Sequence, residues 1–513
     1  MNIKKRYFFL NENIGKGLTG VESSAFLRAK LFREYLDITP VFVTFRYNNE
    51  LQQNQKTFIK SGILDPNIPL LNIYDFYCEK EEPASENNNQ SVMRQTDATY
   101  EVVGNTLDYR VLRNEQLSMY IKYHENSRLV SFINYFDHNK KIFKRDFYDY
   151  QGYLSKICCL EPNTGRYITE SYLDRNGKTR VIIHNDVTGE NVKVSRILVL
   201  NKQGMVESIF NSLDEFVYDF TKKISERYYS DELFFIVDRN KPFYCGLRQL
   251  NHPNLHIIPI IHSMQTAGID VMKGSLNSNF QEVFADLSDS MVYPIVFTEQ
   301  QKQDIETRFG VKDKLTVIPH STHYKEPYVK FEDRNPLLLT AISRLSPEKQ
   351  VDKIIDVFAL INKAIPETKL DIWGYGGLDK TLQEQIDKLS LSHAIKLRGI
   401  TDNPYKIFKQ SGMSFLTSRC EAFALVIMES LVTGCPAASF DIKYGPSSMI
   451  KDGINGILSP LNDVETLANK AIKILKNPDL HEKMCKNAYE MGKNLHASEV
   501  AKLWGEMLKN IGI

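Results

Sequence analysis

The chain has 513 residues, so two or three domains are expected rather than a single core. Hydrophobic residues make up 42% and charged residues 25%, which is the balance of a globular protein and excludes a disordered chain or one built of membrane spans. The formal net charge is +1, so no basic field favours a nucleic-acid partner, and an anionic acceptor must be met by a local patch.

The start of the chain and its cysteines predict the compartment. Basic residues precede a short apolar run that breaks at residues 11–13, which is too short for an export signal. No segment reaches the roughly 18 apolar residues of a membrane span. The seven cysteines are odd in number and lack the C-x2-C spacing of zinc sites, which favours buried free thiols. We therefore predict a cytoplasmic protein with at most peripheral membrane contact.

The first 75 residues read as the opening of a βαβ unit. Residues 7–10 predict a strand, residues 15–20 a glycine-rich turn, residues 22–35 a helix and residues 40–45 a second strand. The turn has G-x-G-x-x-G spacing, but no acidic residue follows the second strand promptly, so a nicotinamide site is rejected. The polar residues 79–90 predict a linker or loop.

Residues 98–205 have a different pattern, one typical of β-strands joined by tight turns. Short aromatic and β-branched runs are separated by turn residues roughly every 12 to 15 positions, as in consecutive hairpins of an antiparallel sheet. The clearest turn is at residues 174–177. Because predicted strands and helices alternate again after this segment, we predict a β-meander inserted into the α/β domain, in preference to a free-standing β domain.

Strands alternate with helices again after this segment. Apolar runs at residues 233–238, 255–261 and 294–298 complete a first α/β set. A second set has strands predicted at residues 337–342, 369–373, 395–397, 413–416 and 436–440. This pattern indicates parallel, doubly wound sheets. Two such domains imply a cleft between them, with ligands at the carboxyl ends of the strands.

Cations and glycines follow the strands of the second set. Arg344 and Lys349 flank a proline-bearing turn and suit a diphosphate, although a solvated loop is the alternative explanation for this pair alone. Gly374 allows close approach of the backbone to a ligand, or marks a simple tight turn. Gly399 and Ile400 could present backbone groups to a flat base.

Two glutamates enclose an apolar run. Glu421 and Glu429 are eight residues apart, and the run between them predicts a buried helix that begins at Ala422. Eight residues are close to two helical turns, so both carboxylates are expected on nearly the same face. Buried carboxylates need partners, and sugar and ribose hydroxyls are suitable ones. The helix start would offer N–H groups and a positive dipole end to a phosphate.

The sequence contains no Asp-x-Asp pair, the metal site expected of metal-dependent sugar transfer. Charge on a leaving diphosphate would then fall to Arg344, Lys349 and the helix start, which predicts a mechanism without a metal or other cofactor. His262 follows the predicted strand at residues 255–261, where a lone histidine is more often structural than catalytic.

Together these motifs resemble glycosyltransferase family 4, in which two facing Rossmann-like domains form the GT-B fold. The resemblance is carried by residues 343–349, 374–377 and 398–399 and by the Glu421-x7-Glu429 element. Residues 20–30, 144–155 and 441–446 narrow it to a bacterial subgroup. That subgroup contains serine-aspartate-repeat and serine-rich adhesin GlcNAc transferases and wall teichoic acid α-glycosyltransferases.

The resemblance implies a retaining enzyme that uses a UDP-sugar, most often UDP-GlcNAc. Arg344 and Lys349 would hold the diphosphate, Glu421 the sugar hydroxyls and Glu429 the ribose. His262 would lie near the reacting sugar and completes the implied catalytic set of Glu421, Arg344 and Lys349. Further donor contacts would come from Gly20, Gly374, Gly399, Ile400, Ala424 and Leu425.

Three positions depart from the family pattern. Ala422 and Ala424 stand where close relatives tend to carry glycine, or glycine or serine, and both still supply an N–H group to a phosphate if their dihedrals are ordinary. Gln265 stands where relatives often place a second histidine, so no role of that histidine is carried over.

The predicted fold is α/β of GT-B type, with residues 1–95 and 216–325 as the N-terminal Rossmann-like domain and residues 96–215 as a β-rich insertion. Residues 326–495 are expected to bind the donor and residues 496–513 to form a C-terminal helix. The insertion would guide a long acceptor or mediate homo-oligomerisation.

The predicted function is transfer of GlcNAc, with glucose as the other possible sugar, from a UDP-sugar to serine hydroxyls of a repeat-bearing surface protein. One alternative acceptor is poly(polyol-phosphate) wall teichoic acid. Another alternative is a non-catalytic GT-B partner of a second transferase, for which a decayed donor site would be expected. Arg344, Lys349, Glu421 and Glu429 are all present, which favours catalysis.

Overall fold

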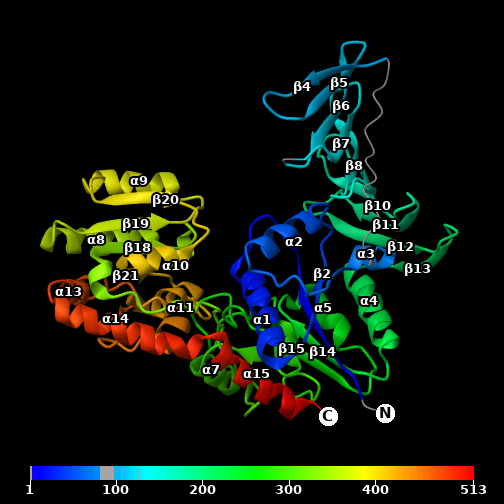
Figure 1. Cartoon of the computed structure of the whole chain (residues 1–513). Helices are drawn as coiled ribbons and strands as arrows, with labels where there is room; N and C mark the ends of the chain where they lie inside the picture. The colour runs from blue at the N-terminus through cyan, green and yellow to red at the C-terminus, as the bar shows by residue number, and fades with distance from the viewer. Residues whose placement is uncertain (1–2, 81–96, 126, 513) are drawn as a thin grey trace. The chain divides into compact units, whose positions relative to one another are not determined.

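The computed structural model describes residues 3–80, 97–125 and 127–512 (Figure 1). The chain divides into two compact units. Unit 1 comprises Met1–Ala29 and Ile38–Ile257, and unit 2 comprises Lys30–Asp37 and Ile258–Ile513. The linker predicted at residues 79–90 falls mostly on residues 81–96, outside the described part of the chain.

A parallel sheet with strand order β15-β14-β1-β2-β3 organises unit 1. Its first strand, β1 (Lys5–Asn11), pairs with β14 (Glu232–Val237) on one side and β2 (Val41–Thr44) on the other, and β2 pairs with β3 (Leu70–Asn72). The fifth strand is β15 (Leu255–Pro259). Every residue of β14 is buried, as expected for a strand covered on both faces.

Five helices accompany this sheet, and the strand order is that of a doubly wound sheet, because the chain starts in the middle and later returns on the other side. They are α1 (Gly20–Leu36), α2 (Leu51–Lys60), α3 (Ile73–Tyr77), α4 (Leu213–Arg227) and α5 (Asn240–Leu247). The strands and the α1 helix predicted from the sequence are therefore present within a residue or two of their expected positions.

Between α3 and α4 the chain forms a ten-stranded antiparallel sheet in which spatial order follows chain order, which is a meander (Figure 1). This confirms the predicted insertion. The turn at residues 174–177 connects β10 to β11, and the Asp174 carboxylate accepts hydrogen bonds from the N–H groups of Asn176 and Lys178. The strands are β4 (Thr99–Val102), β5 (Tyr109–Arg113), β6 (Gln116–Tyr123), β7 (Val130–Phe136), β8 (Ile142–Tyr148), β9 (Leu154–Leu160), β10 (Tyr167–Leu173), β11 (Thr179–Asp186), β12 (Lys193–Leu200) and β13 (Val206–Phe210).

Aromatic rings join the insertion to the rest of unit 1. Tyr74 of α3 stacks on Tyr172 of β10 with ring centroids 4.1 Å apart, and Tyr47 meets Tyr172 edge-on at 5.4 Å. The Tyr47 hydroxyl lies 2.5 Å from Ser155 Oγ of β9. Rings of this size bury large apolar areas, so these contacts hold the base of the meander in a fixed position on the α/β part.

The second parallel sheet lies in unit 2 and has the order β20-β19-β18-β21-β22-β23. All five neighbouring pairs are parallel. The strands are β18 (Asn335–Ile342), β19 (Lys369–Trp373), β20 (Ile395–Gly399), β21 (Ser411–Leu416), β22 (Ala437–Asp441) and β23 (Gly456–Pro460). The chain starts at β18, moves outward to β20 and reverses at β21, so the topological switch point lies between β18 and β21.

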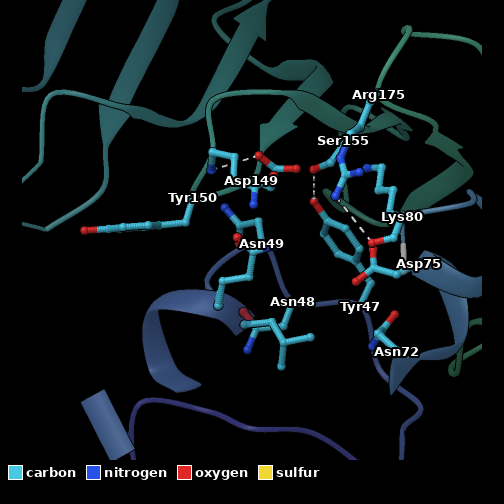
Figure 2. A pocket seen from close by; sticks show the side chains of 13 residues that line it. Tyr47, Asn48, Asn49, Asn72, Asp75, Lys80, Asp149, Tyr150, Ser155 and Arg175 are labelled. Carbon is cyan, nitrogen blue, oxygen red and sulfur yellow. Dashed lines mark hydrogen bonds between the residues drawn. The ribbon is translucent and has the colours of Figure 1, made fainter. Parts of the chain in front are cut away.

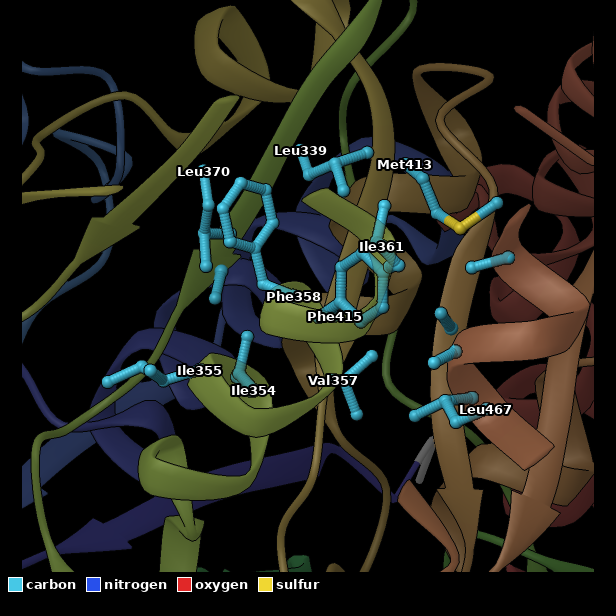
Figure 3. Close-up of a cluster of buried hydrophobic side chains, with 14 of the residues drawn as sticks. Leu339, Ile354, Ile355, Val357, Phe358, Ile361, Leu370, Met413, Phe415 and Leu467 are labelled. Carbon is cyan, nitrogen blue, oxygen red and sulfur yellow. The ribbon is translucent and has the colours of Figure 1, made fainter. Parts of the chain in front are cut away.

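The helix α8 (Val351–Ala364) packs against this sheet and forms a hydrophobic core with it. Val351, Ile354, Ile355, Phe358 and Ile361 are buried at helical spacing. They meet buried side chains of β18, β19 and β21, among them Leu339, Leu370, Met413 and Phe415 (Figure 3). This packing fixes the ends of the three strands from which the loops of the candidate site emerge.

The other elements of unit 2 surround this core. A short parallel pair is formed by β16 (Ile295–Val296) and β17 (Thr316–Val317). The remaining helices are α6 (Gln281–Ala285), α7 (Glu299–Phe309), α9 (Asp379–Lys388), α10 (Pro404–Gln410), α11 (Leu425–Val432), α12 (Gly445–Met449), α13 (Val464–Leu475), α14 (Pro478–Gly492) and α15 (Ala497–Ile511). Within the described residues, no helix has both the length and the apolar content needed to cross a bilayer.

Candidate active site

Two loops meet at the switch point of the second sheet. The loop after β18 carries Arg344 and Lys349, and the loop after β21 carries Glu421. Backbone contacts hold the loops together, because Arg419 N–H donates to the Glu348 carbonyl at 2.9 Å and Thr417 Oγ1 donates to the Gln350 carbonyl at 2.7 Å. Ligands of doubly wound sheets bind at this kind of position.

Lys349 and Glu421 form an ion pair, with Lys349 Nζ 2.5 Å from Glu421 Oε1. The side chains are only 18% and 15% exposed. Ser418 Oγ also donates to Glu421 Oε1, at 2.7 Å. An ion pair this far from water costs desolvation energy and is strongly destabilised when one partner is lost. The site therefore presents a fixed ammonium and a fixed carboxylate side by side.

The helix after Glu421 is present but begins at Leu425, so its predicted start at Ala422 is wrong. The Glu421 N–H donates to the Lys443 carbonyl at 3.1 Å, and the Glu421 carbonyl accepts from Tyr444 N–H at 2.5 Å. This pairing with the loop after β22 keeps Glu421 extended, and α11 begins only at Leu425. The expectation that both glutamates share one helical face is wrong for the same reason.

Ala424 adopts the left-handed conformation, with φ 69° and ψ 71°, and caps the start of α11. The condition of ordinary dihedrals, on which its N–H contact with a phosphate depended, is therefore not met at Ala424. A left-handed conformation costs an L-residue about 1–2 kcal/mol and suits glycine. The fold maintains this strain at the position where the chain turns from the Glu421 loop into the helix.

Glu429 lies in the interior of α11, partly buried, and has no ion-pair or hydrogen-bond partner among the described residues. Burial raises the pKa of its carboxyl from 4.5 to about 7. The nearby Tyr405, whose hydroxyl lies 2.8 Å from Thr322 Oγ1, also titrates above its ordinary pKa because of burial and the Glu429 charge. An unpartnered carboxylate of this kind is suited to a ligand hydroxyl.

Arg344 is the exposed member of the predicted cation pair. Its guanidinium lies 3.0 Å from Glu348 Oε1, and its side chain is 65% exposed. A surface ion pair of this type is weak. Arg344 is therefore free to exchange Glu348 for an anionic ligand at little cost, unlike Lys349.

Gly374 and Gly399 lie at the ends of neighbouring strands. A Cβ atom on Gly374, which has φ 144°, would lie 1.8 Å from the Ser343 carbonyl oxygen, so only glycine fits there. The Gly374 N–H donates to the Gly399 carbonyl at 2.7 Å. Ile400, which follows Gly399, is 70% exposed. The backbone packing therefore requires glycine at position 374, whether or not this residue also contacts a ligand at the nearby site.

His262 belongs to a cluster of four rings within unit 2. It stacks on His320 with centroids 5.7 Å apart and contacts Phe297 at 5.4 Å. His320 lies 4.0 Å from Phe297 and meets Phe423 edge-on at 5.3 Å. Because Phe423 is part of the Glu421 loop, the cluster connects His262 to that loop. The sequence analysis missed His320, although its position just after β17 was a usable signal.

Gln265 is fully buried and hydrogen-bonded to Tyr444, with its Nε2 2.7 Å from the phenol oxygen. Tyr444 is the residue that pairs with the Glu421 backbone. The amide at this position therefore supports the loop that carries Glu421. The sequence analysis also missed Tyr444.

Gly20 lies in unit 1, where it is exposed and begins α1. Beside it, Arg239 Nη2 donates to Glu22 Oε1 at 2.6 Å, which secures the first turn of that helix. The described residues include no group of three or more His, Cys, Asp or Glu side chains that could hold a metal ion.

Comparisons with known proteins give the class of this site. Residues 325–491 match the family model for "Glycosyl transferases group 1", and residues 100–211 match "GtfB middle domain", which coincides with the meander. The poly(glycerol-phosphate) alpha-glucosyltransferase of Bacillus subtilis strain 168 is 23% identical, over 98% of this chain and 75% of the relative. The poly(ribitol-phosphate) alpha-N-acetylglucosaminyltransferase of Staphylococcus aureus strain COL is 25% identical, over 93% of both chains. A GtfA subunit of UDP-N-acetylglucosamine–peptide N-acetylglucosaminyltransferase, from Streptococcus gordonii, is 29% identical over 46% of this chain and 48% of the relative.

Solved structures show the same fold. A crystal structure of TarM superposes with a TM-score of 0.83 at 20% identity over 99% of both chains. The pneumococcal O-GlcNAc transferase GtfA, in complex with UDP and GlcNAc, superposes with a TM-score of 0.79 at 21% identity over 100% of this chain and 99% of that one. The fold is therefore GT-B with an antiparallel insertion, as predicted.

The Lys349–Glu421 ion pair at the switch point lies within the residues that match the group 1 family model. The chain is a glycosyltransferase whose residues 325–491 form a group 1 domain, which confirms the predicted resemblance.

The strain at Ala424 is testable by substitution. Ala424→Gly should raise the free energy of unfolding by about 0.5–1 kcal/mol, because glycine adopts the left-handed conformation without the Cβ clash. The matched control is Ala359→Gly, inside α8, which should lower it by about 1 kcal/mol. Chemical denaturation measures both, and an equal loss of stability in the two variants would contradict the account.

The raised pKa of Glu429 predicts a pH-dependent stability. The folded protein binds the Glu429 proton more tightly than the unfolded chain does. The stabilisation that results is fully present below pH 4.5 and is lost as pH rises through about 7. Glu429→Gln, which mimics the protonated form, should therefore be more stable than the wild type by roughly 2 kcal/mol at pH 8 and no more stable at pH 4.5. The exposed Glu384→Gln should change little at either pH. A gain for Glu429→Gln that is the same at both pH values would argue against the assignment.

Proposed function

We propose that this enzyme transfers GlcNAc from UDP-GlcNAc, with retention of anomeric configuration, to serine hydroxyls of a repeat-bearing surface protein. The observation that carries the proposal is the Lys349–Glu421 pair at the switch point, with the unpartnered Glu429 on the following helix. The pneumococcal GtfA and S. aureus TarM complexes of the same fold contain UDP, which supports a UDP-sugar donor.

The donor would be held by residues of both switch-point loops. Lys349 would exchange part of its interaction with Glu421 for the diphosphate, and Arg344 would add a second cation from the loop edge. The freed Glu421 oxygen would accept a hydroxyl of the donor sugar, and Glu429 would accept the ribose hydroxyls. Gly374, Gly399, Ile400 and Leu425 would supply backbone and apolar contacts, while His262 would lie beside the reacting sugar.

The leaving UDP develops negative charge as the bond to the sugar breaks. The Thr417 contact holds the Lys349 backbone and Glu421 holds its ammonium group beside the site before the donor binds, so Lys349 is already placed to stabilise this charge. The start of α11 adds its N–H groups and dipole. We propose on this basis that transfer needs no metal ion or other cofactor.

The acceptor has two candidates. Peptide acceptors are named for GtfA relatives that are 23–29% identical, one of them over 97% of this chain. Wall teichoic acid is the second candidate, because the relatives that act on poly(glycerol-phosphate) and poly(ribitol-phosphate) align over 98% and 93% of this chain. A non-catalytic partner role is disfavoured by the intact ion pair and glutamates.

The insertion and the compartment complete the proposal. The insertion would guide a long acceptor or join copies of the enzyme, and its β4–β5 hairpin exposes Val102 and Leu107. The cysteines are thiols rather than disulfides, which fits a reducing compartment, and we propose that transfer occurs in the cytoplasm.

A transfer assay tests the proposal. Purified enzyme with labelled UDP-GlcNAc should modify a Ser-Asp repeat peptide, and Glu421→Gln should lower the rate about 100-fold because the sugar hydroxyls lose a charged acceptor. The exposed Glu384→Gln is the control and should keep wild-type activity.

Omitting divalent cations and adding a chelator should leave the rate unchanged, and NMR of the product should show the α-anomer. Label found only in poly(ribitol-phosphate) would overturn the peptide acceptor in favour of teichoic acid. Absence of transfer and of UDP-GlcNAc hydrolysis would overturn the donor assignment.

A further inference from the structure

A groove runs along α2 of unit 1, beneath loops of the meander. It consists of two hollows that share Tyr150. The narrower one is drawn in Figure 2, where Tyr47, Asp75, Ser155 and Arg175 converge from the α/β part and the meander while the Tyr150 ring points away from them. The wider one lies along α2 beside His124 and is named the His124 hollow.

The face of α2 that lines the His124 hollow is mostly polar. Gln53, Asn54, Thr57 and Phe58 of α2, with Glu50 just before it, have the i, i+3, i+4, i+7 spacing of one helical face. Phe58 alone is apolar, and Asn54 is only 5% exposed. Asn54 Nδ2 donates to the Ile14 carbonyl at 2.9 Å. Gln53, in contrast, is half-buried and Thr57 exposed, so these two side chains can meet a ligand that enters the hollow from solvent.

His124 supplies a second and independent observation. It is 3% exposed, lines the hollow, and neither of its ring nitrogens has a hydrogen-bond partner. Its Nδ1 makes only a long contact of 3.7 Å with Glu50 Oε1, and Glu50 and the Tyr148 and Asp149 backbones act on its pKa against the effect of burial. Burial lowers the pKa of His124, so the neutral ring has one donor and one acceptor to offer. A buried polar group of this kind needs a partner.

The charges in the groove select the class of ligand. In the His124 hollow, Glu50 and Glu125 outnumber the single cation Lys16, whose Nζ is 2.9 Å from Glu125 and 3.8 Å from Glu50. In the narrower hollow, Asp75 and Asp149 balance Lys80 and Arg175. A groove with no excess of positive charge disfavours a phosphate or an acidic peptide. Amides, carboxylates and a neutral imidazole instead suit a ligand that both donates and accepts hydrogen bonds.

Aromatic side chains define the shape of the site. The Tyr150 ring meets His124 edge-on at 5.2 Å, and the buried Phe58 also lines the hollow. Rings beside polar groups suit a ligand with apolar C–H faces and hydroxyl edges.

We propose that the His124 hollow binds a neutral sugar unit, separate from the donor site in its residues. Lys16 belongs to the glycine-rich loop at residues 15–20, so a sugar that contacts Lys16 and Glu125 would also fix that loop before α1. Use of the hollow to hold an acceptor that already carries sugar rests on the proposed function, whereas the binding itself does not.

The test is ligand-observed NMR with methyl α-GlcNAc on full-length protein. Saturating UDP and a Glu421→Gln background remove the donor site from the measurement. Binding should persist under these conditions, and Tyr150→Ala and Gln53→Ala should each weaken it by roughly tenfold or more. The matched control is Tyr229→Ala, whose side chain is 60% exposed elsewhere in unit 1 and which should bind like the parent.

Thermal unfolding identifies any variant that fails to fold, and two independent variants keep the test decisive. The same experiment with glycerol 3-phosphate and with ethylammonium should show no binding. Absence of UDP-insensitive sugar binding, binding unchanged in both groove variants, or preferential binding of either charged probe would overturn the proposal. Sugar binding without transfer activity would instead contradict only the proposed function.

Discussion

The ion pair between Lys349 and Glu421 joins two loops that leave adjacent strands of one parallel sheet. Its charges are 2.5 Å apart and largely shielded from water, so the pair is costly to form and more costly to leave half-made. Packing of the sheet and hydrogen bonds between the two loops offset this cost. When the donor binds, its diphosphate would interact with Lys349 and its sugar with Glu421. Until then, each of these two side chains satisfies the charge of the other.

Several backbone constraints hold these loops in place. A Cβ atom at Gly445 would lie 1.9 Å from the Phe423 carbonyl oxygen, so the loops after β21 and β22 approach as closely as glycine permits. Arg334, which is 5% exposed, donates to the carbonyls of Phe408 and Ser411, before and at the start of β21, and to that of Thr433 after α11. The left-handed Ala424 lies between these fixed points. Rigid surroundings of this kind are what allow strain and a buried ion pair to persist at a site.

Much of the fold could be predicted because its signals are local. Apolar runs of strand length gave most strands of both parallel sheets, although Leu70–Asn72 was missed, and the Asp174 turn gave a hairpin of the meander, since each depends on a few adjacent residues. The Gly456–Pro460 strand was missed because it is short and contains glycine and proline.

The parts of the site that were mispredicted depend on distant residues. Helical periodicity around Glu421 was overridden by its pairing with Tyr444, more than 20 residues later in the chain. The stacking of His320 on His262 joins loops after two different strands, which no single-sequence pattern records. The roles assigned to Arg344, Glu429 and Gly20 remain predictions about a bound donor, and the domain boundaries remain predictions as well.

A double-mutant cycle in UDP-GlcNAc binding tests the central claim most directly. Lys349→Met, Glu421→Gln and the double variant would be compared with the wild type by isothermal titration calorimetry. If the two side chains act as one preformed unit, the loss in the double variant should fall short of the sum of the single losses by about 1 kcal/mol or more. Losses that add within about 0.3–0.5 kcal/mol would show two independent contacts and contradict the account.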